Sequence, residues 1–296
     1  MNQSGIIKSL LSEEADVVLL KVPYEGTVSR GKGAIRGPTA VCRMLGEQVE
    51  TFDYLLGRDI SEKVRIVEKS VKIGKNEQVE DLVKKMEKET GKYFAQRKIP
   101  VVLGGEHSVS VGAILAAKKF FQNLTVVQID AHADLRDDNS DYEDNPKRIT
   151  KYAHSCAMRR VHEAGCQLVQ VGVRAIFSEE AEFIKKEKIE KNIFYTPVKA
   201  SFSKIISRCP TKKIYLTIDV DGFDPSVMPG TGTPEPGGLS WDWTLGFFRE
   251  LFSKKEVVGF DIVEVSPKAD CQRTEYAAAK LLYHLIGLKF SKNNGR

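Results

Sequence analysis

Cysteine is scarce in this sequence and follows no pattern that would build a disulfide framework or a thiolate metal site. The chain has 5 cysteines in 296 residues, and none of them belongs to a Cys-x-x-Cys pair. An odd, scattered set of cysteines is typical of reduced thiols in the cytosol. We therefore expect a cytoplasmic protein whose cysteines remain free.

Long apolar runs, targeting signals and basic tracts are also missing. No apolar stretch approaches the ~20 residues that a membrane-spanning helix needs. Residues 1–5 lack the basic region and apolar core of a secretory signal. The net charge is only +5, and the lysines alternate with acids, as in residues 84–88. These absences argue against a membrane protein and against a nucleic-acid-binding protein.

Short apolar segments alternate with amphipathic segments along the whole chain. Strands are expected at 16–22, 64–67, 99–103, 124–129, 168–173, 193–195, 214–218 and 257–263, and helices at 39–45, 76–97, 109–121, 179–189 and 241–252. Such alternation predicts an α/β fold with three layers, α/β/α, around a mainly parallel central sheet. No repeat, low-complexity segment or long linker divides the chain, so we expect a single domain over residues 1–296.

Histidine and aspartate residues follow three of the expected strands, where ligands gather in parallel sheets. They are His107, Asp130, His132, Asp134, Asp219 and Asp221. A single histidine or an Asp-x-Asp pair after a strand is more often structural. Gathered together, two imidazoles and four carboxylates are costly to bury without cations. Six mainly oxygen ligands suit two ions that share carboxylates, and they favour Mn²⁺ over a cysteine-rich zinc site.

Three longer motifs surround these residues: Gly-Gly-Glu-His-Ser at 104–108, Asp-Ala-His-Ala-Asp at 130–134 and Asp-Val-Asp-Gly-Phe-Asp-Pro at 219–225. Together they resemble the arginase/agmatinase (ureohydrolase) family. The likeness extends from residue 33 to residue 267, and segment 229–240 is similar to the agmatinase branch. This resemblance implies an arginase-like fold and hydrolysis of a guanidino group to urea and an amine.

The same resemblance implies two Mn²⁺ ions per subunit and a role for each ligand. One ion would be held by His107, Asp130, Asp134 and Asp219, and the other by His132, Asp130, Asp219 and Asp221. Asp130 and Asp219 would then bridge the two ions. Such a pair of ions lowers the pKa of a bridging water and prepares it as a nucleophile.

Three residues are implied in catalysis: Asp134, His154 and Glu264. Glu264 matches the carboxylate that pairs with the substrate guanidinium, and His154 matches an active-site histidine suited to proton transfer. Asp134 could pass a proton to the leaving amine. For His154 and Glu264, a hydrogen-bonded structural role is the alternative.

The expected substrate is a small cationic guanidino compound, with agmatine preferred and its products putrescine and urea, as in polyamine biosynthesis. Aminopropylagmatine, arginine and guanidinobutyrate are the alternatives. Residues 136–148 lack the Ser-Gly-Asn-type loop of arginases, and this makes arginine a less favoured substrate. The acids within 137–144 could attract a distal ammonium, but a solvated acidic loop is the preferred interpretation.

Rival classes are disfavoured by the site residues themselves. A non-catalytic oligomeric or regulatory member should have lost ligands. A two-metal hydrolase of phosphoesters or acetylated amines would not need Glu264 in this motif. The resemblance also implies a homo-oligomer, a trimer or a hexamer. The glycine-rich segment 24–38 is interpreted as an ordinary surface loop, and Trp241, Trp243, His162 and His284 are interpreted as structural residues.

Overall fold

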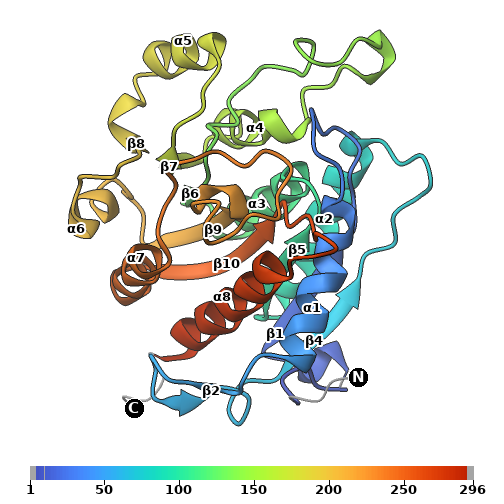
Figure 1. Cartoon of the computed structure of the whole chain (residues 1–296), viewed down its shortest axis with the longest axis vertical. Coiled ribbons are helices and arrows are strands. Elements are labelled where there is room, and N and C mark those ends of the chain that lie inside the picture. The colour runs from blue at the N-terminus through green and yellow to red at the C-terminus, as the bar shows by residue number, and fades with distance from the viewer. Residues whose placement is uncertain (1–4, 10, 292–296) are drawn as a thin grey trace.

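A parallel sheet forms the centre of the protein (Figure 1). The computed structural model describes residues 5–9 and 11–291, and in this part of the chain the sheet has the strand order β4-β1-β5-β10-β9-β6-β7-β8. All neighbouring strands in it run parallel. The strands are β1 (Val17–Val22), β4 (Ile66–Ser70), β5 (Ile99–Gly104), β6 (Thr125–Ile129), β7 (Gln167–Val173), β8 (Ile193–Tyr195), β9 (Lys213–Asp219) and β10 (Glu256–Val263).

Helices cover both faces of this sheet, which confirms the three-layer α/β/α expectation. They are α1 (Gly37–Glu47), α2 (Val79–Ala95), α3 (Ser108–Phe121), α4 (Ala157–Glu163), α5 (Ser178–Lys186), α6 (Phe202–Ile206), α7 (Trp241–Lys254) and α8 (Arg273–Phe290). One apolar cluster joins the sheet to α1, α6, α7 and α8, and a second joins it to α2, α3, α4 and α5.

Strand β1 places apolar side chains on both faces of the sheet. Val17 and Leu19 belong to the first apolar cluster, whereas Val18 and Leu20 belong to the second. Successive side chains of a strand point to opposite faces, so a strand covered on both sides must be apolar throughout. The run of short, β-branched side chains in residues 17–22 meets this requirement.

Several expected elements have shifted ends in the structure; the helix expected at 76–97, for example, is α2 (Val79–Ala95). The strand expected at 64–67 is β4, which begins at Ile66, because the N–H of Val64 is bonded to the carbonyl of Ile60 in a turn. The helix expected at 179–189 ends at Lys186, and Lys188 then adopts a left-handed φ of 58° that a helix cannot contain.

A small two-stranded antiparallel sheet was not expected at all. It pairs β2 (Phe52–Asp53) with β3 (Arg58–Asp59). Strands of two residues carry too little periodicity to be recognised in a sequence. No helix among the described residues is long and apolar enough to cross a membrane.

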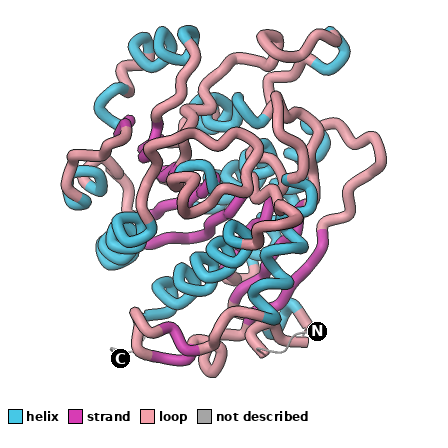
Figure 2. The backbone as a smooth tube through the Cα atoms, viewed as in Figure 1, coloured by secondary structure: helices cyan, strands magenta, loops and turns pink. Residues whose placement is uncertain are grey.

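The strand order brings the predicted site residues to one edge of the sheet. Strands β5, β10, β9 and β6 are consecutive neighbours, and their carboxyl ends point the same way. His107 follows β5, Asp130 follows β6, Asp219 ends β9 and Glu264 follows β10. Figure 2 shows long loops over this end of the central strands. Parallel pairing therefore collects residues from four distant segments at one place.

Candidate metal centre

His107 lies at the centre of a first group of carboxylates. Its Nδ1 is 3.1 Å from Oδ2 of Asp130 and 3.0 Å from Oδ2 of Asp134. The Oδ2 of Asp219 is 3.7 Å from the same nitrogen. His107, Asp130 and Asp134 are buried and offer ligand atoms close enough to share one ion.

His132 forms a second group with Asp221 and with the other oxygen of Asp130. Its Nδ1 is 3.1 Å from Oδ2 of Asp221 and 3.5 Å from Oδ1 of Asp130. Asp130 therefore directs one oxygen at each histidine and belongs to both groups. This is the arrangement that a carboxylate bridging two ions requires. Asp219, the other predicted bridge, lies beside the first group but belongs to neither three-residue group.

Backbone N–H groups hold these carboxylates in place. Asp130 Oδ1 accepts the N–H of His132 at 2.6 Å, and Asp219 Oδ1 accepts the N–H of Asp221 at 2.8 Å. Asp221 Oδ1 accepts the N–H of Ala131 at 3.1 Å, which ties the end of β9 to the end of β6. Side chains add to this: Gln128 Nε2 donates to Asp130 Oδ2 at 2.7 Å, and Thr233 Oγ1 donates to Asp221 Oδ2 at 3.2 Å. These hydrogen bonds together orient the ligands.

Two of the predicted catalytic residues have strained backbones. Asp134 has φ 54° and Glu264 has φ 62°, in the left-handed region that non-glycine residues seldom occupy. Such conformations cluster at functional sites, where the surrounding structure imposes them. The N–H of Glu264 donates to the carbonyl of Gly105, where a side chain would collide with the backbone of Tyr24. Glycine is therefore required at position 105.

A hydrogen bond at Nε2 determines the tautomer of the His107 ring. Nε2 lies 2.8 Å from Oγ1 of Thr217, and this hydroxyl donates its own proton to Oδ1 of Asp261 at 2.6 Å. Thr217 can therefore only accept from Nε2–H, which leaves a lone pair on Nδ1. Nδ1 is buried and has no hydrogen-bond partner among the described residues. A nitrogen lone pair that faces carboxylate oxygens fits a metal ion between them.

The electrostatics of the cluster also favour a bound cation. Burial disfavours a charged His132, but the charges and hydrogen bonds of Asp221 and Asp130 together outweigh it and raise the pKa of His132 to about 12. Burial and the charge of Asp221 raise the pKa of Asp219 well above its usual value. Burial and the charge of Asp130 raise the pKa of both Asp134 and Asp221. Divalent cations would relieve this crowding of negative charge.

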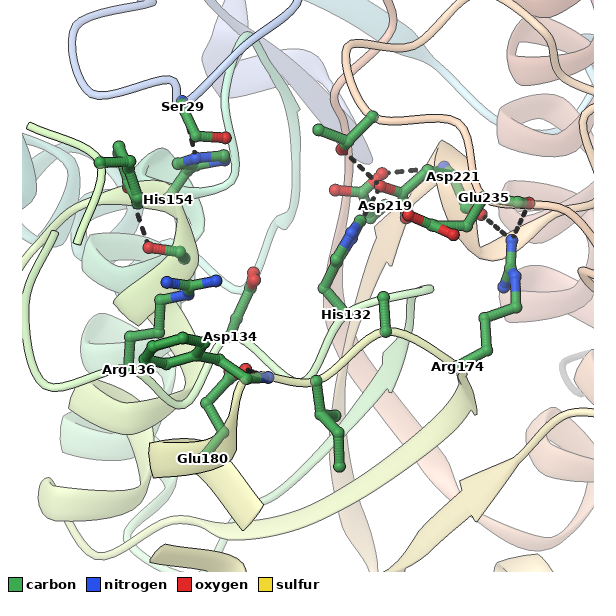
Figure 3. Close-up of a pocket in the computed structure, with 16 residues that line it drawn as sticks. Ser29, His132, Asp134, Arg136, His154, Arg174, Glu180, Asp219, Asp221 and Glu235 are labelled. Atoms are coloured by element: carbon green, nitrogen blue, oxygen red, sulfur yellow. Dashed lines mark hydrogen bonds and ion pairs between the residues drawn. The ribbon is translucent and has the colours of Figure 1, made fainter. Parts of the chain in front are cut away.

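His154 and Glu264, the other two predicted catalytic residues, lie next to each other beside the metal ligands. His154 Nδ1 is 3.6 Å from Oε1 of Glu264, and the same oxygen accepts the N–H of His107 at 2.8 Å. Burial opposes a charge on His154, but Glu264, with the charges of Glu106 and Asp134, outweighs it and raises the pKa of His154. The N–H of Ser29 donates to His154 Nε2 at 3.2 Å (Figure 3).

A cavity of about 460 Å³ opens over the cluster. Figure 3 shows His154 and Arg136 on one side of it and His132, Asp221 and Glu235 on the other. Its lining is Ser29, His132, Asp134, Arg136, Tyr142, His154, Ser155, Arg174, Ala175, Ile176, Phe177, Glu180, Asp219, Asp221, Thr233 and Glu235. The metal-type residues thus face a space large enough for a small substrate.

The charged residues of the wall differ in whether they are free to meet a ligand. Arg136 is paired with Asp141, and Arg174 donates to backbone carbonyls, including that of Glu235 at 2.8 Å. Both oxygens of Glu180 accept backbone N–H groups, at 2.8 and 2.7 Å. The carboxylate of Glu235 has no partner within residues 5–9 and 11–291.

The acids of segment 137–144 lie outside the cavity. Asp137 accepts from Arg160 at 3.1 Å and is paired with Lys151 at 3.3 Å. Tyr142 is the residue of this segment that lines the cavity in the described structure. Its ring meets that of His154 edge-on, with centroids 6.0 Å apart. No motif or spacing in the sequence distinguishes Tyr142 from the rest of this segment.

The interpretation of segment 24–38 as an ordinary surface loop was wrong. Ser29 lines the cavity and bonds His154, and the N–H groups of Gly26 and Thr27 bind the buried carboxylate of Glu106. The glycine density of this segment was the signal that could have revealed it, since glycines permit close approach of the backbone.

The four residues interpreted as structural have packing or hydrogen-bonding roles, as expected. Trp243 stacks on Phe247, and Trp241 lies against Phe223. His162 Nε2 is 3.3 Å from Oε2 of Glu187. His284 Nδ1 is 2.7 Å from Oδ2 of Asp53.

The chain matches a known protein family, related sequences and solved structures. The Arginase family model matches residues 15–287. A relative from Synechocystis sp., named N(1)-aminopropylagmatine ureohydrolase, is 36% identical over 283 residues, which cover 93% of this chain and 89% of the relative. The agmatinase of Pyrococcus horikoshii is 34% identical, with 93% of each chain covered. The crystal structure of agmatine ureohydrolase of Thermoplasma volcanium has a TM-score of 0.79 at 28% identity, covering 98% of this chain and 94% of that one.

Proposed function

This chain belongs to the arginase family and is a ureohydrolase, and from that premise we propose that it uses two Mn²⁺ ions to hydrolyse agmatine to urea and putrescine. The observation that carries the proposal is the position of Asp130 between His107 and His132, of which His132 lines the cavity. Two ligand groups that share one carboxylate suit a two-ion centre.

We assign the ligands as the sequence predicts them. His107, Asp130, Asp134 and Asp219 would hold one ion, and His132, Asp130, Asp219 and Asp221 the other. The outward lone pair of His107 Nδ1 and the raised pKa values of the carboxylates support this set. When bound, the ions supply an activated water and neutralise the charge that develops during attack.

The residues around the centre bind the substrate and move protons. The buried carboxylate of Glu264 pairs with the planar guanidinium, and the N–H of His107 holds its Oε1 in place. His154 transfers protons through Nδ1, which faces Glu264. Asp134, which lines the cavity, would pass a proton to the leaving amine.

The tail of the substrate lies along the cavity toward Glu235. Agmatine carries a primary ammonium four carbons from its guanidinium, and the unpartnered carboxylate of Glu235 offers that ammonium a counter-charge. N1-aminopropylagmatine is a second candidate, because the Synechocystis relative is named for it. Both compounds share the same guanidinobutylamine unit.

We further propose that residues 1–296 form one cytoplasmic domain that assembles into a trimer or a hexamer. One eight-stranded sheet runs through the described part of the chain, and the cysteines there form no disulfide. Light scattering on the purified protein measures the assembly directly, and a monomer would contradict this part of the proposal.

The function is tested by urea release from four guanidines: agmatine, aminopropylagmatine, arginine and guanidinobutyrate. The protein is assayed after chelation and again after Mn²⁺ is restored, with metal content measured in each sample. We expect no activity without metal, recovery with Mn²⁺ and the highest kcat/KM for agmatine. A preference for arginine would contradict the substrate assignment. No urea from any compound with metal bound would overturn the function.

A further inference from the structure

Glu106, which directly precedes His107 in the chain, is a fully buried carboxylate. Its Oε2 accepts the N–H groups of Gly26 and Thr27, both at 2.8 Å. Its Oε1 accepts the hydroxyls of Thr27 at 2.6 Å and of Ser108 at 2.5 Å. Four donors satisfy this buried charge, and three of them belong to residues 26–27. Glu106 therefore fixes this segment to the end of β5.

The hydroxyl of Thr27 connects Glu106 to His154. Its hydroxyl proton is given to Glu106, so the oxygen can accept, and it receives the backbone N–H of His154 at 3.0 Å. Two residues further along, the N–H of Ser29 donates to Nε2 of the His154 ring at 3.2 Å. The same short segment thus holds His154 at its backbone and at its ring.

The contact with Ser29 selects one tautomer of the ring. An Nε2 that accepts a hydrogen bond carries a lone pair, so the proton of the neutral imidazole is on Nδ1. Nδ1 is the nitrogen that lies 3.6 Å from Oε1 of Glu264. Segment 26–29 therefore presents the protonated nitrogen of His154 toward the residue that pairs with the guanidinium.

We propose that Glu106 and Thr27 are positioning residues for the reaction: they hold segment 26–29 so that Ser29 fixes the orientation and tautomer of His154. This inference rests on the proposed function, in which His154 transfers protons. Neither Glu106 nor Thr27 lines the cavity, so both act through His154 and not on the substrate.

Variants that change the hydroxyl of Thr27 distinguish this positioning role from simple packing. Thr27→Val keeps the shape of the side chain but removes both the donor to Glu106 and the acceptor for His154. Thr27→Ser keeps both hydrogen bonds and removes only a methyl group. Thr90→Val is the matched control, since Thr90 is buried in α2 and its hydroxyl has no partner among the described residues.

The three variants are compared with the wild type as Mn²⁺-loaded full chains, by kcat, KM, metal content and Tm. Correct proton transfer by a positioned side chain contributes roughly 10²–10⁴-fold, so a misplaced His154 should lower kcat at least ~10-fold. We expect this loss in Thr27→Val with KM and metal content unchanged. Thr27→Ser should retain most of the wild-type kcat, and Thr90→Val should retain all of it.

A spectroscopic measurement tests the same assignment without turnover. In ¹⁵N-histidine spectra with diamagnetic Mg²⁺ in place of Mn²⁺, His154 should show an unprotonated Nε2 in the wild type and in Thr27→Ser. This signature should be lost in Thr27→Val. Unchanged kcat in Thr27→Val, equal losses in the Val and Ser variants, or an unchanged His154 signature would each overturn the proposal. Lack of urea release by the wild type would instead overturn the proposed function, and the ¹⁵N result would still decide the positioning.

Discussion

Thr217 and His107 form a hydrogen bond that determines which nitrogen of the histidine faces the metal cluster. Thr217 Oγ1 lies 2.8 Å from His107 Nε2 and is itself a donor to Asp261 at 2.6 Å. The ring is thereby held with Nδ1 toward Asp130 and Asp134. Outer partners of this kind orient metal-binding histidines and make them stronger ligands.

Replacing Thr217 should therefore weaken metal binding. Thr217→Val keeps the volume of the buried side chain but removes the acceptor for Nε2–H. Loss of such an outer partner typically costs ~10–100-fold in metal affinity, and we expect a loss of that order. Titration of the metal-free protein with Mn²⁺ measures it. Thr217→Ser is the control and should bind as the wild type does; equal affinity in the Val variant would refute the role of Thr217.

Asp130 and His132 should both be indispensable for activity. Asp130→Asn removes the negative charge from the carboxylate shared by the two ligand groups, and His132→Ala removes the imidazole of the second group. We expect either change to abolish metal-dependent urea release. The assay is paired with metal analysis and with Tm, which shows that the variant is folded. Full activity with normal metal content in either variant is the result that this assignment cannot accommodate.

Glu235 should discriminate substrates by their distal amine. Glu235→Gln removes the counter-charge while keeping the shape of the side chain, and a hydrogen bond to a charged group contributes about 1.5–3 kcal/mol. We expect KM for agmatine to rise at least ~10-fold, since 1.4 kcal/mol is a factor of ten. Butylguanidine, which lacks the amine, serves as the control substrate and should show no change. A parallel rise for both compounds would place Glu235 outside tail recognition.

The acids at 138, 143 and 144 should not contribute to substrate binding. Asp138 and Glu143 accept N–H groups of their own loop, at 2.9 Å in each case. With Asp144, they lie outside the cavity lining. The triple variant Asp138→Asn, Glu143→Gln, Asp144→Asn should keep the wild-type KM for agmatine, measured at low and at physiological salt. A higher KM at low salt would indicate that the loop attracts the cationic substrate.

The Asp53–His284 pair predicts a pH dependence of stability remote from the site. Burial opposes ionisation of Asp53, but the hydrogen bond and charge of His284, together with the backbone N–H groups of Leu55 and Leu56, outweigh it and lower the pKa of Asp53 below 3.8. A folded pKa below the unfolded value stabilises the protein above pH 3.8, and this stabilisation is lost as pH falls through the folded pKa. Asp53→Asn should therefore lower Tm at neutral pH, and the difference from wild type should shrink in acid. A constant difference at all pH values would contradict the ionic role of Asp53.

The sequence by itself determined the fold class and which histidines and aspartates meet in the candidate metal cluster. Alternating apolar and amphipathic segments require a covered parallel sheet, and such a sheet brings the residues after β5, β6 and β9 to one edge. Residues such as Asp130 and His132 could be selected because both their chemistry and their place after a strand are local properties. The family motifs then supplied the reaction.

Only the tertiary structure decided which other residues surround the cluster. Glu106 reaches Gly26 across 80 residues, and the N–H of His154 reaches Thr27 across 127. Contacts over such separations leave no periodicity in the sequence, because they depend on which loops the strand order brings together. Tyr142 and Glu235 line the cavity for the same reason. A sequence records what each residue can do, whereas the packing of the sheet and its loops decides which residues meet.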